Sequence, residues 1–86
     1  MIAKIENIEI RGFEVKQSKK DGKDYMVVRF EDVTGKGYEL VDRDMENQRY
    51  YNRGVQGDLY IDIDRAAKFT RIEICRFAAA GGKKND

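Results

Sequence analysis

Apolar residues recur at every second position in five short stretches, the period of β-strands half buried in a sheet. The predicted strands cover residues 8–15, 25–30, 38–43, 59–64 and 72–74. In the first of them the apolar positions change parity at Gly12, between Ile10 and Phe13. A glycine at such a change indicates a bulge or a sharp bend, which small barrels need to turn a strand between sheet faces.

Turn residues separate the predicted strands. They are Asp21-Gly22, Thr34 to Gly37, Gly54 with Gly57, and residues 65–69. Asp-Gly is a strong signal for a tight hairpin turn. Between the third and fourth strands, Asp44 is placed to cap a short helical turn over residues 45–48, because aspartate accepts hydrogen bonds from the first free backbone N–H groups.

Five short strands with a bent first strand predict an all-β fold, a five-stranded OB-like small barrel with a protruding basic β-hairpin. Periodicity does not distinguish this barrel from an SH3-like one. Residues 1–78 are expected to form the single domain, with residues 79–86 as a flexible tail.

Charge is unevenly distributed along the chain. The 86 residues carry 38% charged side chains but a net charge of only +1, which argues against histone-like and acidic disordered proteins. Residues 11–29, here named the basic hairpin, contain six basic and three acidic side chains, whereas residues 30–47 contain six acidic and two basic ones. A basic loop suits a polyanion such as nucleic acid. The alternative is a hairpin kept polar for solubility.

Several kinds of chemistry are excluded by composition. The chain has no histidine and a single cysteine, so Ser-His-Asp and Cys-His catalysis, imidazole metal sites and disulfide frameworks are not expected. Cys75 is predicted to be a buried or edge thiol of the last strand. The pairs Asp42/Asp44 and Asp62/Asp64 lack a third acidic ligand, which favours solvated strand faces over a metal or acid/base site. We therefore expect no enzyme activity, cofactor or metal.

The aromatic residues strengthen the nucleic-acid hypothesis. If Met26, Val28 and Phe30 face the core, then Tyr25 and Arg29 face outward beside the basic hairpin. An exposed tyrosine beside cations is typical of a base-stacking platform, although tyrosines on half-buried strands are often packing residues. Phe69 lies in a polar turn, where a core phenylalanine is less expected.

The order of several segments resembles the helix-destabilising, single-stranded-DNA-binding proteins of filamentous phages. The resemblance spans about Met1 to Phe77 and rests on five short segments. They are Gly22-Lys23-Asp24-Tyr25, Tyr38-Glu39-Leu40-Val41-Asp42-Arg43, Gly57-Asp58-Leu59-Tyr60, Phe69, and Ile72-Glu73-Ile74-Cys75-Arg76. Such proteins are dimers with an OB-like barrel that coat DNA cooperatively.

The resemblance also implies residue roles. It places Tyr25 against bases, Tyr38 on a loop that also meets a neighbouring dimer, and Phe69 in the partner's groove. Arg43 and Arg76 correspond to phosphate-binding residues, as the hairpin lysines do. The complete predicted DNA-binding set is Lys16, Lys19, Lys20, Lys23, Tyr25, Arg29, Tyr38, Arg43, Phe69 and Arg76.

The expected function is non-sequence-specific, cooperative binding of single-stranded DNA during phage or mobile-element replication, by phosphate neutralisation and base stacking. The expected partners are single-stranded DNA, or RNA, and a second copy of the chain. No apolar run suits a signal peptide or a membrane span, so the expected location is the cytoplasm, of the host if the protein is phage-encoded. The alternatives are an SH3-like protein-interaction adaptor, an RNA-binding regulator and, more distantly, a carboxylate-dependent metal hydrolase.

Overall fold

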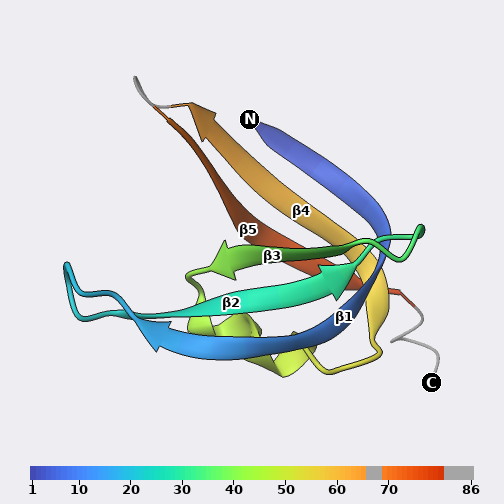
Figure 1. The fold of residues 1–86 in the computed structure, drawn as a ribbon, viewed down its shortest axis with the longest axis horizontal. Helices are drawn as coiled ribbons and strands as arrows, with labels where there is room; N and C mark the ends of the chain where they lie inside the picture. Colours follow the sequence, from blue (N-terminus) through green and yellow to red (C-terminus); the bar gives the residue numbers. More distant parts are fainter. Residues whose placement is uncertain (66–68, 81–86) are drawn as a thin grey trace.

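The structure, a computed structural model, describes residues 1–65 and 69–80. Its elements are β1 (Ile2–Gln17), β2 (Asp24–Glu31), β3 (Gly37–Asp42), the 3₁₀ helix η1 (Met45–Tyr50), β4 (Gln56–Arg65) and β5 (Thr70–Ala79) (Figure 1). The helical turn after Asp44 is confirmed, since the Asp44 side chain accepts a hydrogen bond from the Glu46 N–H at 3.1 Å. No helix in the described part of the chain is long and apolar enough to cross a membrane.

The strands form one closed sheet in the order β1-β2-β3-β5-β4. Strand β1 pairs with β4 through its first half and with β2 through its second half. The ring closes through a parallel contact between β3 and β5, which rests on the single register pair Val41 and Glu73, while the other neighbours are antiparallel. The predicted OB-like small barrel is confirmed.

Strand β1 reaches both of its neighbours by bending twice. The expected break at Gly12 is present, with a register shift between Ile10 and Gly12 and a positive φ of 150°. A second shift, between Ile5 and Ile8, was not predicted. There Asn7 adopts φ 58° and its N–H donates to Asp58 at 3.1 Å. Asparagine tolerates this left-handed conformation, so the strand bends at Asn7 without ending there. Strand β1 therefore begins at Ile2, rather than near residue 8 as predicted.

A buried carboxylate lies in the core. Asp42 is 1% exposed and accepts hydrogen bonds from the Tyr51 hydroxyl at 2.5 Å, the Asn47 amide at 2.9 Å and the Asp44 N–H at 2.9 Å. These bonds tie η1 to the end of β3 and satisfy the buried charge. Burial and this contact raise the pKa of Tyr51. The expectation that Asp42 lies on a solvated strand face is therefore wrong.

Three further expectations need correction. Gly57 does not bracket a turn but is buried inside β4, against the backbone of β5. Cys75 is an exposed thiol where β5 shifts register between Ile74 and Arg76. Strand β5 also continues through Ala79, one residue beyond the predicted domain limit, whereas residues 81–86 of the predicted tail and residues 66–68 of the predicted last turn lie outside the described residues.

Two hairpins extend from the barrel. The β1–β2 hairpin projects to the left in Figure 1, and the β4–β5 hairpin projects upward beside the N-terminus. They account for the elongated shape, with extents of 42 × 24 × 20 Å. Gly22 turns the first hairpin with φ 73°, as the Asp21-Gly22 pair predicts.

Candidate nucleic-acid interface

The outer face of β1, β2 and β3 carries a row of alternating cations and tyrosine. Met26 and Val28 are buried, so Tyr25 projects from the other side of β2, as predicted. Lys16 on β1 is the register partner of Tyr25. On the other side, the guanidinium carbon of Arg43 lies 5.5 Å from the centre of the Tyr25 ring, within cation–π range. We name Lys16, Tyr25 and Arg43 the cation–tyrosine row.

Arg43 is held in this row by an acid from a different part of the barrel. Its Nε donates to a Glu73 carboxylate oxygen at 2.8 Å, across the contact that closes the sheet between β3 and β5. This bond raises the pKa of Arg43, which as an arginine is charged at physiological pH in any case. Because the bond uses Nε, the two terminal nitrogens can still face an anion.

The tip of the basic hairpin presents three lysines to solvent. Lys19, Lys20 and Lys23 are all exposed. The turn itself is closed by backbone hydrogen bonds of 2.9 Å from Ser18 to Lys23 and from Gly22 to Ser18. Asp21 accepts from the Lys23 N–H at 3.0 Å, and this bond lowers the pKa of the Asp21 carboxyl. The lysine ammonium groups therefore extend from an ordered turn, at the same end of β1 and β2 as Lys16 and Tyr25.

Tyr38 lies at the opposite end of the same sheet, where both its ring and its hydroxyl group are held by other side chains. It is 40% exposed, and its ring stacks on Phe30 with centroids 5.5 Å apart. Its hydroxyl donates to Asp32 at 3.0 Å, and Asp32 also accepts from Thr34 and from the Lys36 N–H. These bonds, led by that from the Thr34 hydroxyl, lower the pKa of Asp32 to about 2, while Asp32 raises the pKa of Tyr38. Asp32 was not among the predicted site residues, although an aspartate before a glycine-containing turn often accepts hydrogen bonds from the turn in this way.

Replacing Asp32 by asparagine should move the pKa of Tyr38 back toward its ordinary value, because the negative charge beside the hydroxyl is removed. The measurement is a titration of tyrosinate absorbance, in which Tyr38→Phe identifies the contribution of Tyr38. In the native protein the stabilising contacts of ionised Asp32 are complete above the ordinary pKa of 3.8 and are lost as the pH falls through about 2. Asp64→Asn is the matched control, since Asp64 is exposed on β4. Equal Tyr38 titrations in Asp32→Asn and the native protein would contradict this assignment.

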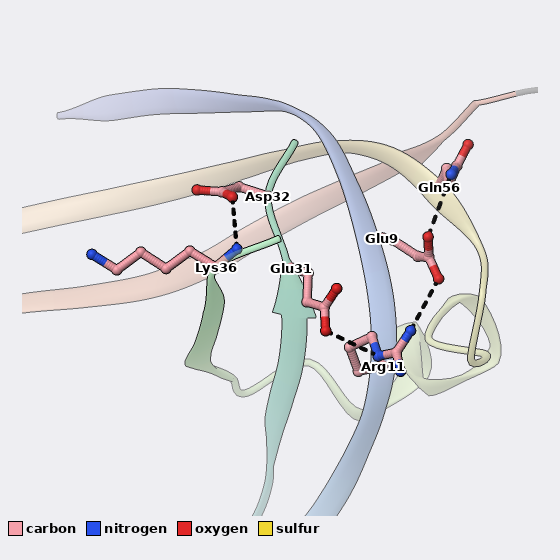
Figure 2. A network of polar contacts seen from close by, with 6 residues as sticks. All are labelled: Glu9, Arg11, Glu31, Asp32, Lys36 and Gln56. Atoms are coloured by element: carbon pink, nitrogen blue, oxygen red, sulfur yellow. Dashed lines mark hydrogen bonds and ion pairs between the residues drawn. The ribbon is translucent and has the colours of Figure 1, made fainter. Parts of the chain in front are cut away.

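Beside Tyr38 lies an open hollow of about 490 Å³. Its walls are two arginines, two glutamates, an aromatic pair and a glycine: Arg11, Arg29, Glu31, Glu39, Phe30, Tyr38 and Gly37. Arg11 is held between Glu9 and Glu31, at 3.2 Å and 3.5 Å, and Gln56 donates to Glu9 at 3.4 Å (Figure 2). Arg11 belongs to the basic hairpin but was not among the predicted site residues. Pairing of β1 with β2 and of β2 with β3 places Arg11 in the same hollow as Arg29 and Tyr38.

The remaining predicted residues belong to the β4–β5 hairpin. The guanidinium carbon of Arg76 lies 4.3 Å from the centre of the Tyr60 ring, and the Lys4 amine lies 5.9 Å from that centre. Tyr60 was not among the predicted site residues, and it alternates with acids on the outer side of β4. Phe69 precedes β5 directly and is 59% exposed. The predicted site is thus divided between the outer face of β1–β2–β3, the end of that sheet at Tyr38, and the β4–β5 hairpin.

Within residues 1–65 and 69–80, no group of three or more Asp, Glu or Cys side chains is arranged to hold a metal ion. The pair Asp62 and Asp64 is exposed on β4, as expected for a solvated strand face. Comparison of the chain with protein-family models, with curated proteins and with solved structures finds no match.

Proposed function

We propose that this protein binds single-stranded DNA on the outer face of β1, β2 and β3, without strong sequence preference. The observation that carries the proposal is the cation–tyrosine row. Tyrosine offers a ring on which any base can stack, while Lys16 and Arg43 on either side neutralise phosphates of the same strand. Lys19, Lys20 and Lys23 extend this positive surface along the basic hairpin.

The architecture supports the same conclusion. OB-type barrels bind oligonucleotides on the face of their second and third strands and with the loops that join strands 1–2 and 4–5. Here Tyr25 and Arg29 lie on β2, the three lysines occupy the β1–β2 turn, and Phe69 borders the connection between β4 and β5. Arg43 directly follows β3.

Dimerisation and cooperative coating of DNA form part of this proposal. One protomer offers few cations, so useful affinity calls for several linked copies along a strand. The exposed Phe69 and Ile72, 59% and 40% exposed, give the β4–β5 hairpin an apolar surface that a second copy would cover. The resemblance to the phage proteins points to the same assembly, to DNA replication and to the host cytoplasm.

The direct test is a titration with oligo-dT, followed by tyrosine fluorescence at several salt concentrations. We expect quenching, and an association constant whose logarithm falls linearly with the logarithm of the salt concentration. Absence of quenching at low salt and micromolar protein would contradict DNA binding.

A parallel titration with oligo-U separates the RNA alternative, because a site that uses the 2′-hydroxyl prefers RNA. Light scattering at several protein concentrations tests the dimer.

A further inference from the structure

The hollow beside Tyr38 differs in charge from the rest of the proposed DNA-binding face. Its two arginines are balanced by two glutamates, Glu31 and Glu39. Arg29 and Glu39 are register partners on β2 and β3, and neither forms an ion pair with residues 1–65 or 69–80. A phosphate here would meet carboxylates as well as guanidinium groups, so the hollow is poorly suited to neutralising the DNA backbone.

The same composition suits a nucleobase. Arginine offers only hydrogen-bond donors and ionised glutamate only acceptors, so the adjacent pair Arg29 and Glu39 complements a flat group whose edge carries both kinds. Tyr38 also lines the hollow and is 40% exposed, and its ring is supported from behind by the buried Phe30, with 5.5 Å between the ring centroids. The volume, about 490 Å³, falls within the range of small-ligand sites.

The walls of the hollow are held in place before any ligand arrives. Asp32 fixes the Tyr38 hydroxyl at 3.0 Å, and Glu9 and Glu31 fix Arg11 (Figure 2). A Cβ added to Gly37 would meet nothing within 4 Å, so the strand leaves open space at this wall. A preorganised site of this kind loses little side-chain entropy on binding.

We infer that this hollow is a nucleobase subsite, in which Glu39 accepts a hydrogen bond from an exocyclic amino group and Arg29 donates to an adjacent ring nitrogen or carbonyl. The inference rests on the proposed function, since the base belongs to the bound single strand. Cytosine carries such an amino group at N4, beside acceptors at N3 and O2, and carboxylates are its usual partners. Thymine would place its O4 acceptor against Glu39. The subsite therefore adds a modest preference for cytosine over thymine to binding that is otherwise tolerant of sequence.

The test compares affinities for oligo-dC and oligo-dT of equal length and at the same salt concentration. For the native protein we expect oligo-dC to bind at least about fivefold more tightly, the lower end of what one good base contact provides. Glu39→Gln should reduce this ratio to near one, because a glutamine amide can donate to thymine O4 as well as accept from cytosine N4. Glu14→Gln is the matched control, since Glu14 is an exposed acid on β1 that does not line the hollow.

Gly37→Val provides a second variant. The added side chain would extend into the open space of the hollow and narrow it, and Gly37 lies in a strand, where valine is favoured. It too should abolish the ratio while thermal unfolding stays as in the native protein. A ratio that collapses in Glu39→Gln and Gly37→Val but persists in Glu14→Gln supports the subsite. Equal native affinities for the two oligonucleotides, or equal ratios in Glu39→Gln and Glu14→Gln, overturn the subsite and leave DNA binding standing. If the native protein binds neither oligonucleotide, the proposed function itself fails.

Discussion

Replacing Tyr25 by alanine should weaken oligo-dT binding by about 5- to 150-fold, which corresponds to the roughly 1–3 kcal/mol that stacking on one aromatic side chain contributes. Tyr25 is half buried on the outer side of β2, and its ring contacts Arg43 rather than the core. The substitution should therefore leave the barrel folded, which circular dichroism and thermal unfolding would show. Affinity is measured from the salt-dependent titration described above, with anisotropy of a labelled oligonucleotide as the signal.

Tyr60→Ala is the matched control for Tyr25→Ala. Tyr60 is also a half-buried tyrosine on an outer face, with an arginine guanidinium near its ring. Its neighbours along the outer side of β4, Asp58 and Asp62, pair with Lys4 and with the N-terminal ammonium, however, so this surface has no excess of positive charge to attract a DNA strand. Tyr60→Ala should keep near-native affinity. An equal loss in both variants would contradict the assignment of stacking to the cation–tyrosine row, and an unchanged Tyr25→Ala would remove Tyr25 from the site.

Replacing Gly57 by alanine should lower the free energy of unfolding by about 3 kcal/mol, at the upper end of the cost of overpacking. A Cβ at this position would overlap the Ala78 carbonyl oxygen and lie 2.8 Å from the Ala79 Cα, both of them backbone atoms of β5. Backbone cannot move aside as a side chain can, so the β4–β5 pairing itself must shift. Urea unfolding followed by circular dichroism gives the change.

Gly37→Ala tests whether the cost at Gly57 comes from the close approach of strands. Both glycines lie in strands, but the added Cβ meets no atom within 4 Å at Gly37. Gly37→Ala should therefore leave the unfolding midpoint unchanged or raise it slightly, since alanine restricts the unfolded chain. The explanation fails if the two variants unfold at the same urea concentration.

Much of the fold could be predicted because it depends on local patterns. Alternation of apolar residues identified all five strands, and the parity change at Gly12 identified a bend in β1 that the register shift confirms. The bend at Asn7 could not be predicted, since asparagine is only an occasional breaker within a strand. Gly57 looked like a turn residue because a glycine next to a turn and a glycine pressed against a neighbouring strand have the same local sequence.

Part of the candidate site could also be predicted, because that part depends on local sequence patterns. Alternation alone indicated that Tyr25 faces away from the core. The contact between Arg43 and Tyr25 depends on the pairing of β2 with β3, and the bond from Arg43 to Glu73 joins residues thirty positions apart. Arg11 was missed as a site residue, because its role depends on which side chains the pairing of β1, β2 and β3 brings beside it.

By itself the sequence determined the strands, the outward direction of Tyr25 and the excess of positive charge in the basic hairpin, because each follows from residues adjacent in the chain. Only the tertiary structure decided which distant charges meet. The contact between β3 and β5 sets Glu73 against Arg43, and the segment after η1 places Tyr51 over Asp42. Pairing of β1 with β2 and of β2 with β3 places glutamates beside Arg11 and Arg29. Because electrostatic interactions depend on distance through space, a charge count along the chain could not separate the cation–tyrosine row from the charge-balanced hollow.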